Sequence, residues 1–256
     1  MVGILQHARA GTGRGCSYLL CRPVGQEATR TAAMYRVLSD RLTREGCEAL
    51  TFDYHGTGDS PGEEADQSLA AWTDDVLAAH ELLCADGNTS VHWFAMGLGA
   101  TLAARAAARS TRPPSHIVLW EPVLDGPAYL DALMTAHRTE LTREFRYPWH
   151  ELLRQGRVEE PAAPGDVLGF SIGETLAREL RALPGLPLAP ALRRGIRIVC
   201  GIHPEQRVHF GDILDGSNGL LKLQYVETRA NWMSSQAMGT ATVPADVPRT
   251  LLSTFA

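Results

Sequence analysis

Short apolar runs alternate with longer amphipathic segments over the first half of the chain. The amphipathic segments, such as Thr31–Glu45 and Ser68–Ala85, carry apolar residues three and four positions apart, which predicts helices. The apolar runs predict buried strands at Cys16–Arg22, Cys47–Phe52, Ser90–Phe94 and His116–Trp120. This alternation of strand and helix predicts an α/β protein with a mostly parallel, twisted sheet flanked by helices and joined by right-handed crossovers.

The pattern changes between residues 126 and 190. Helix candidates occur there at Tyr129–Leu141 and Ile172–Leu183, a Pro-rich linker separates them, and no strand is evident. A long insertion at the carboxyl edge of a parallel sheet commonly forms a lid. We therefore expect residues 1–125 and 191–256 to form the core and residues 126–190 a helical cap. The later core elements are expected at Gly195–Ile202, Gly219–Glu227 and, as a last helix, Val247–Phe255.

Charge, hydropathy and cysteine spacing limit which partners and which cell compartment we expect for this chain. The net charge is −5 with interspersed signs, so we expect no nucleic-acid partner and no membrane surface. No N-terminal signal peptide and no membrane span of about 20 apolar residues is expected. The cysteines form no C-x-x-C pair, which predicts reduced thiols and a cytoplasmic location; they are Cys16, Cys21, Cys47, Cys84 and Cys200.

The stretch Val91–Ala103 has an unusual order of residue types. It runs from β-branched and aromatic residues through a Gly-bracketed turn into an Ala-rich segment. Strand, sharp turn and helix in this order are typical of a nucleophile elbow, the G-x-S-x-G turn. The five turn positions read Ala95, Met96, Gly97, Leu98 and Gly99, so the apex has no side chain. Because such an apex sits at positive φ, glycine relieves backbone strain once a hydroxyl is not needed.

Five motifs together resemble the α/β-hydrolase superfamily, and most closely the serine-aminopeptidase-like hydrolases found beside exosortase systems and in biosynthetic clusters. They are PVGQE at 23–27, FDYHGTGDS at 52–60, AMGLG at 95–99, LWEPVLDG at 119–126 and DVLGFSI at 166–172. The resemblance implies an α/β-hydrolase fold with a helical cap. It also implies a mechanism in which a hydroxyl or thiol, a histidine and a carboxylate act together.

The positions that the resemblance assigns to this triad hold other residues. The nucleophile position is Gly97, the histidine position is Trp232, and no histidine follows His209. At the position of the acid stands Pro204, with Glu205 one residue later. The resemblance therefore implies a degenerate catalytic triad, with the covalent step lost.

The oxyanion hole implied by the fold consists mainly of backbone and does not depend on the triad. We expect the amide of Leu98 to supply one donor and the amide of Gly25 or Gln26 the second. Such donors at helix N-termini stabilise a carboxylate, carbonyl or enolate oxygen. This predicts a site that binds and polarises an acyl or carbonyl compound without a covalent intermediate.

Several side chains at the carboxyl ends of the predicted strands are candidates for the chemistry. His55, Glu27 and Asp125 are candidate acid–base residues. The alternatives are loop packing for His55, a helix N-terminal charge for Glu27 and a turn role for Asp125. The candidate substrate contacts are Met96, Glu121, His203 and Glu205. No metal site is expected, because H-x-E-x₃-H at 203–209 follows no standard ligand spacing, and no cofactor is expected.

Three functions remain open at this point. The first is a non-classical biosynthetic enzyme that acts on a small acyl or carbonyl substrate through the retained oxyanion hole. The second is a pseudoenzyme, a catalytically dead binding or scaffolding subunit. The third is a thioesterase-like ester or thioester hydrolase, or an acyltransferase, whose catalytic residues are relocated, with Cys200 as one candidate nucleophile. A homodimer is left open.

Overall fold

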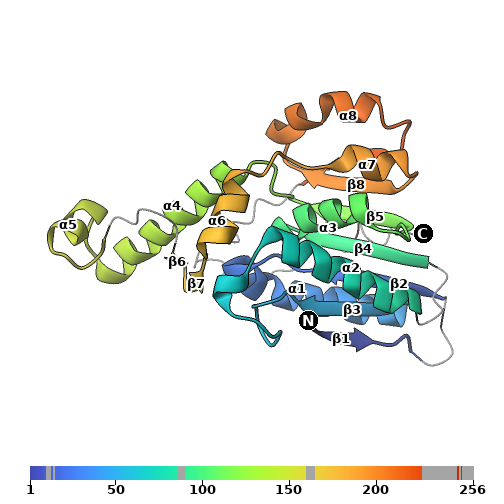
Figure 1. The fold of residues 1–256 in the computed structure, drawn as a ribbon, viewed down its shortest axis with the longest axis horizontal. Helices are drawn as coiled ribbons and strands as arrows, with labels where there is room; N and C mark the ends of the chain where they lie inside the picture. The colour runs from blue at the N-terminus through green and yellow to red at the C-terminus, as the bar shows by residue number, and fades with distance from the viewer. Residues whose placement is uncertain are drawn as a thin grey trace.

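A seven-stranded sheet in the order β1-β3-β2-β4-β5-β8-β9 forms the centre of the molecule (Figure 1). The computed structural model describes residues 1–9, 13, 15–85, 90–159, 165–226, 247 and 249. β1 runs antiparallel to β3, and all other neighbouring strands are parallel. The strands are β1 Val2–Gln6, β2 Cys16–Cys21, β3 Glu48–Asp53, β4 Ser90–Met96, β5 His116–Trp120, β8 Arg197–Ile202 and β9 Leu221–Tyr225.

Helices cover both faces of the sheet, so the central strands are apolar on both sides and read as continuous hydrophobic runs. On one face, α1 packs against residues of β2, β4 and β5; on the other, α2, α3 and α7 enclose the larger core. The helices of the core are α1 Gly25–Arg44, η1 Glu64–Asp66, α2 Leu69–Ala85, α3 Leu98–Arg109, α7 Leu188–Arg193, η2 Pro204–Phe210 and α8 Gly211–Asp215. The predicted α/β class and mostly parallel sheet are confirmed.

The segment between β5 and α7, predicted as a helical cap, contains one short helix and two short strands in addition to the two predicted helices. α4 Gly126–Phe145 and α5 Trp149–Arg154 extend away from the sheet, and α6 Glu174–Arg181 lies beside α4 (Figure 1). The expectation of no strand in the cap is wrong, because β6 Asp166–Val167 and β7 Phe170–Ser171 pair as a hairpin. Strands of two residues leave no readable alternation of apolar and polar positions, and the turn places Leu168 and Gly169 at positive φ.

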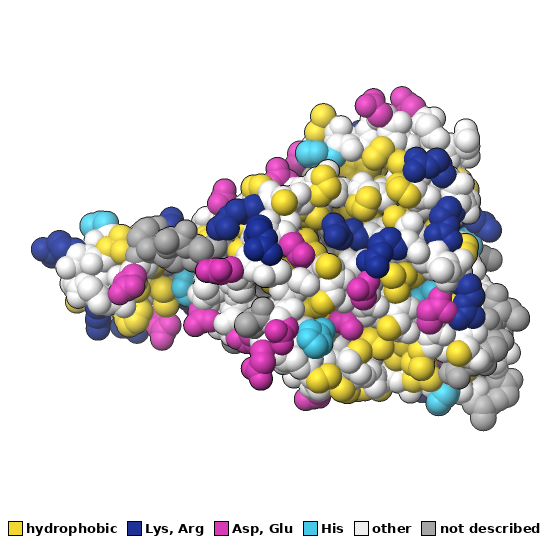
Figure 2. All heavy atoms as spheres, in the orientation of Figure 1, with side chains coloured by type: hydrophobic (Ala, Val, Ile, Leu, Met, Phe, Trp, Pro, Cys, Tyr) yellow, Lys and Arg dark blue, Asp and Glu magenta, His cyan; other side chains and the backbone are white. Residues whose placement is uncertain are grey.

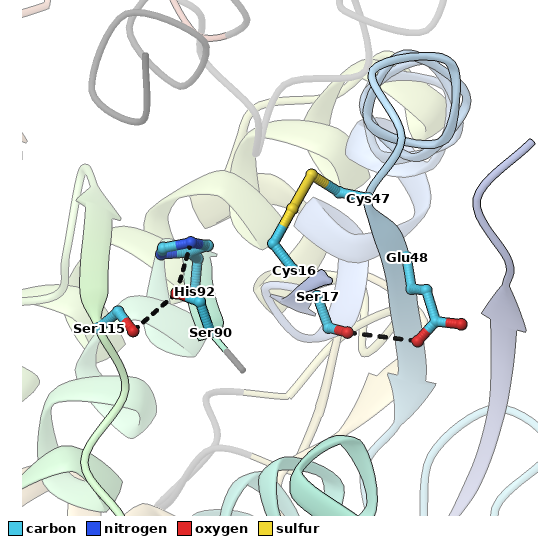
Figure 3. The surroundings of a disulfide bond; sticks show 7 residues. All are labelled: Cys16, Ser17, Cys47, Glu48, Ser90, His92 and Ser115. Carbon is cyan, nitrogen blue, oxygen red and sulfur yellow. Dashed lines mark hydrogen bonds between the residues drawn. A yellow bond between two sulfur atoms is a disulfide. The ribbon is translucent and has the colours of Figure 1, made fainter. Parts of the chain in front are cut away.

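The amino end of the sheet carries a disulfide that the cysteine spacing did not predict. Cys16 opens β2, Cys47 directly precedes β3, and their sulfur atoms are bonded with the Cα atoms 5.1 Å apart (Figure 3). The prediction of reduced thiols is therefore wrong for this pair, while Cys21, Cys84 and Cys200 are free. Because disulfides persist mainly in oxidising compartments, the basis for predicting a cytoplasmic location is removed.

Two features of the structure bear on possible partners: the distribution of surface charge and the character of the helices. Acidic and basic side chains are interspersed on the face drawn in Figure 2, without a stripe of one sign. Within the described ranges, no helix is long and apolar enough to cross a membrane. The predicted last helix, Val247–Phe255, lies outside the described residues except for positions 247 and 249.

Candidate active site

The turn after β4 has the geometry of a nucleophile elbow with a glycine at its apex. Gly97 lies between β4 and α3 with φ 58° and ψ −132°. Its N–H donates a hydrogen bond to the carbonyl of Trp120 at 3.0 Å, and its carbonyl accepts one from the N–H of Ala100 at 3.1 Å. Glycine adopts this positive φ without the steric cost that other residues incur. The turn is therefore held by backbone alone, with no side chain at the apex.

A second glycine of the turn brings the loop after β2 into contact with the elbow. A Cβ atom at Gly99 would overlap the backbone carbonyl of Arg22. The first turn of α3 thus lies directly against the chain that leads from β2 into α1. This close approach explains why the fourth and fifth motif positions, Leu98 and Gly99, sit beside residues 22–27.

Glu27 occupies the space in front of the empty apex. α1 begins at Gly25, six residues earlier than the predicted helix start at Thr31, so Glu27 lies in its first turn. A Cβ atom at Gly97 would lie 3.1 Å from Glu27 Oε2 and 3.2 Å from Pro23 Cβ. The carboxylate of Glu27 therefore stands next to the position from which a nucleophile would project.

The surroundings of Glu27 favour its protonated form. Burial, and next the negative charge of Glu121, raise the pKa of Glu27 from 4.5 to about 7. The Tyr129 hydroxyl, which donates a hydrogen bond to Glu27 Oε2 at 3.4 Å, and the charge of Arg30 oppose this rise. A carboxyl group with a pKa near neutrality can both accept and donate a proton at physiological pH.

Glu121 and His203 form a hydrogen-bonded pair at the ends of two neighbouring strands. His203 Nε2 lies 2.7 Å from Glu121 Oε1, with side-chain exposures of 19% and 17%. Glu121 directly follows β5 with φ 47°, and its N–H donates to the carbonyl of Gly201 in β8. A non-glycine residue at positive φ costs on the order of 1–3 kcal/mol. Glu121 thus contacts His203 from a backbone conformation that carries an energetic cost.

The predicted oxyanion-hole residues line one cavity of about 510 Å³ between the core and the cap. Gly25 and Gln26 begin α1 and Leu98 begins α3, and the first amides of a helix have no intrahelical acceptor. The cap covers this cavity with apolar side chains, and Phe170 of the hairpin lies 3.7 Å from the position of a Cβ on Gly25. The apolar lining includes Trp72, Leu133, Val167, Phe170, Ile172 and Leu176.

Tyr129 connects the cavity to Glu27, and the sequence patterns did not single it out. It lines the cavity from α4 while its hydroxyl reaches Glu27 Oε2. The only available signal was its place at the start of a predicted cap helix. The hydrogen bond spans 102 residues of sequence, so no local pattern indicates it.

The structure places two of the three candidate acid–base residues away from the apex. Asp125 is the N-cap of α4, and its Oδ1 accepts a hydrogen bond from the N–H of Ala128 at 2.8 Å. The ring of His55 lies against Gly62, where an added Cβ would approach Nε2 to 2.5 Å. Both positions correspond to the structural alternatives, a turn role and loop packing. Of the three, only Glu27 faces Gly97.

The candidate substrate contacts also include some residues that lie at the carboxyl edge of the sheet and some that do not. Glu121 and His203 pair with one another, whereas Glu205 is exposed in the first turn of η2. Met96 is 2% exposed and packs in the core beneath α1, because alternate residues of β4 face opposite sides of the sheet. Trp232 lies outside the described residues.

Neither a relocated thiol nor a metal site emerges from the described part of the chain. Cys200 is fully buried in β8, and burial raises the pKa of its thiol, which disfavours the reactive thiolate. No group of three His, Cys, Asp or Glu side chains suited to a metal ion occurs among the residues that the structure describes.

Comparison with solved structures supports the fold over nearly the whole chain. A carboxylesterase of the thaumarchaeon Nitrososphaera gargenis superposes with a TM-score of 0.63 at 12% identity, covering 99% of this chain and 93% of its own. Est1E of Butyrivibrio proteoclasticus, solved with ferulic acid, gives 0.60 at 15% identity, covering 98% and 94%. MenH of S. aureus gives 0.59 at 13%, covering 98% and 96%. Identities this low establish the α/β-hydrolase fold alone.

Sequence comparison identifies the family. Two Mycobacterium tuberculosis proteins described as uncharacterized are 34% identical over 113 residues, which is 43% of this chain. The matched segment spans 37% of the length of these relatives. The family model for serine aminopeptidases, S33, matches residues 28–163, more than half of the chain. The chain therefore belongs to the serine aminopeptidase S33 family of α/β-hydrolases.

Proposed function

We propose that this chain binds a small acyl or carbonyl compound, polarises its carbonyl group, and uses Glu27 as the acid–base residue without forming an acyl-enzyme. The observation that carries the proposal is the position of Glu27 Oε2, 3.1 Å from where a Cβ of residue 97 would lie. The carboxylate thus lies next to the position from which the side chain of a nucleophile would project. The biosynthetic setting implied by the resemblance is part of the same proposal.

Two helix N-termini support binding of a carbonyl oxygen. The amides of Leu98, at the start of α3, and of Gly25 or Gln26, at the start of α1, border the same cavity. Amide donors that lack intrahelical acceptors stabilise negative charge that develops on a carbonyl oxygen. The cavity of about 510 Å³ is of a size typical for small-molecule sites.

The protonation behaviour of Glu27 supports a direct role in proton transfer. A pKa of about 7 leaves comparable amounts of carboxylate and carboxylic acid at neutral pH. General acid–base catalysis is most efficient when the pKa of the group lies near the working pH. The Tyr129 hydroxyl donates a hydrogen bond to Glu27 Oε2, and Tyr129 itself lines the cavity, so Glu27 lies directly behind the cavity wall at this point.

The proposal is tested with three four-carbon probes: butyrate, p-nitrophenyl butyrate and S-butyryl-N-acetylcysteamine. We expect saturable binding of at least one probe and turnover of the ester or thioester, with the intact mass of the protein unchanged during turnover. Glu27→Gln is expected to lower kcat roughly 100-fold, because general acid–base catalysis contributes about that much or more. Glu174→Gln is the matched control, since Glu174 also lies in the first turn of a helix but is exposed.

Two outcomes would overturn the proposal in different directions. Covalent labelling by a fluorophosphonate, or an acyl adduct in the intact mass, would identify a hydrolase or acyltransferase with a relocated nucleophile. Absence of saturable binding of all three probes would identify a non-catalytic binding or scaffolding subunit.

A further inference from the structure

Two parts of the chain line the cavity with side chains of different character. The cap and α2 contribute mainly apolar side chains, among them Trp72, Leu133, Val167, Phe170, Ile172 and Leu176. The loop after β3 contributes polar ones, among them Thr57, Glu63 and Gln67. Such a cavity fits a ligand that has an apolar part beneath the cap and a polar part toward this loop.

Phe170 brings the cap into contact with the start of α1. Apart from the adjoining chain of α1 itself, the atoms nearest to a Cβ position on Gly25 within the described structure are Phe170 Cγ, Cδ2 and Cβ, at 3.7, 3.8 and 3.9 Å. These are ordinary van der Waals distances. A ligand whose carbonyl oxygen binds the amide of Gly25 or Gln26 therefore has its next carbon atoms beside the Phe170 ring.

The hairpin that carries Phe170 is anchored to the rest of the cap. Phe170 opens β7, which pairs with β6, and β6 lies against α4 (Figure 1). The N–H of Leu168 donates a hydrogen bond to His137 Nδ1 of α4 at 3.1 Å. The Ser171 hydroxyl donates another to Asp166 Oδ1 at 2.7 Å across the hairpin. A ring held in this way can exclude a ligand by size.

We propose that Phe170 is a specificity-determining residue, which admits an unbranched acyl chain beside the bound carbonyl group and excludes an acyl group branched at the adjacent carbon. Because the ring already lies at contact distance, extra methyl groups on that carbon would overlap it. The substrate class is thus a straight-chain aliphatic acyl compound. Its chain runs beneath the cap, and its polar part lies toward the loop after β3.

This inference rests on the proposed function for the position of the carbonyl group, but its test needs no turnover. The probes are butyrate and 2,2-dimethylbutyrate, which carry the same charge and differ by two methyl groups next to the carboxyl group. Their dissociation constants are measured at pH 7 by ligand-observed NMR titration. The proteins are the unaltered chain, Phe170→Ala and Phe170→Trp.

Phe145→Ala is the matched control. Phe145 is also a half-buried phenylalanine of the cap, but its ring lies 5.0 Å from the Arg157 guanidinium and is not part of the cavity lining in the described structure. The control therefore removes a ring of the same size from the cap without changing the proposed contact with the acyl group.

We expect the unaltered protein to bind butyrate roughly tenfold more tightly than 2,2-dimethylbutyrate, because overpacking a filled apolar site costs about this much. In Phe170→Ala the ratio falls to about threefold or less, mainly through tighter binding of the branched probe. In Phe170→Trp the ratio rises, because the larger ring leaves less room. A loosened hairpin could lower the ratio but not raise it, and Phe145→Ala keeps the ratio of the unaltered protein.

The inference is overturned if Phe170→Ala discriminates between the probes as the unaltered protein does, or if Phe170→Trp lowers the ratio. Phe170→Leu replaces any variant that fails to fold by circular dichroism, and should give a ratio between those of the unaltered protein and Phe170→Ala. A ratio that depends on Phe170, without turnover of the ester or thioester, would refute the acid–base role of Glu27 and leave this inference standing. If no protein binds either carboxylate, the inference and the proposed binding of an acyl compound are both wrong.

Discussion

At the amino end of the sheet, His92 and His116 lie with ring centroids 5.3 Å apart, whereas at the carboxyl end Glu27 Oε2 lies 3.1 Å from the position of a Cβ on Gly97. Burial, then His116 and Arg197, lower the pKa of His92 to about 4, while burial and Glu121 raise that of Glu27 to about 7. Both shifts favour the neutral form. Of these two groups, only Glu27 has a pKa within the physiological range, so burial leaves His92 neutral at one end and a titrating carboxyl group at the other.

The two ends also differ in what holds them together. At the amino end, the Cys16–Cys47 disulfide joins the starts of β2 and β3. The Ser90 hydroxyl donates a hydrogen bond to Ser115 Oγ and forms another with His92 Nε2 (Figure 3). At the carboxyl end, a close backbone contact joins Gly99 to Arg22, and Glu121 stands at a positive φ that is costly for a non-glycine residue. We expect the interactions that stabilise the fold to be concentrated at the amino end of the sheet and the strained backbone conformations at the carboxyl end.

The largest effect is expected from removal of the disulfide by Cys16→Ser with Cys47→Ser. The bond closes a loop with a sequence separation of 31, and the chain-entropy relation gives about 3–4 kcal/mol for such a loop. Urea unfolding should show this loss of free energy of unfolding. Cys84→Ser, at a free cysteine, is the matched control, and a loss of equal size there would remove the contrast between the two ends.

A side chain at the apex is expected to cost about 2–3 kcal/mol, from positive φ and from overpacking. In Gly97→Ala the new Cβ would meet Glu27 Oε2 at 3.1 Å. Combining Gly97→Ala with Glu27→Ala removes this contact but leaves the backbone strain. We therefore expect the double variant to recover part of the loss in a double-mutant cycle, and strictly additive losses would show that Glu27 does not fill the apex space.

Ionisation of Glu27 is expected to lower the free energy of unfolding at high pH. Its pKa is raised from 4.5 to about 7 in the folded protein, so the folded state binds this proton more tightly than the unfolded chain does. The contribution of this group to the free energy of unfolding therefore falls as pH rises from about 4.5 to 7. Glu27→Gln removes this ionisation, so we expect the variant to be more stable than the unaltered protein at pH 8. The side chain is only partly buried by surface area, so solvent screens part of the effect and we expect a gain of about 1–3 kcal/mol.

The measurement is urea unfolding of Glu27→Gln and of the unaltered protein at pH 4.5 and pH 8. The two proteins should differ least at the lower pH, where the carboxyl group is protonated in the folded state and about half protonated in the unfolded chain. Glu174→Gln should show no difference of this kind. A gain that is equal at both pH values would point to packing rather than to charge.

The sequence predicts the sheet well because each central strand is an apolar run, and its burial on both faces is a local property. The site is harder to predict because its contacts join distant parts of the chain. The Glu121–His203 pair spans 82 residues, and the Tyr129–Glu27 hydrogen bond spans 102. Cysteine spacing likewise does not reveal that β2 and β3 are neighbours, which is the arrangement that brings Cys16 to Cys47.

Asp125 gives the smallest expected effect and shows why residue type alone did not single out Glu27 as the carboxyl group that faces Gly97. It follows a strand at the carboxyl edge as Glu121 does, but its carboxylate caps α4 through Ala128 N–H. Asp125→Ala should lower the free energy of unfolding by about 1 kcal/mol, and Asp125→Asn, which retains the cap acceptor, by less. Neither change should alter the pH at which Glu27 titrates, because the carboxylate of Asp125 accepts a hydrogen bond at the start of α4. A shift in the pH at which Glu27 titrates in Asp125→Ala, followed by NMR of its carboxyl carbon, would instead place the Asp125 carboxylate in the site.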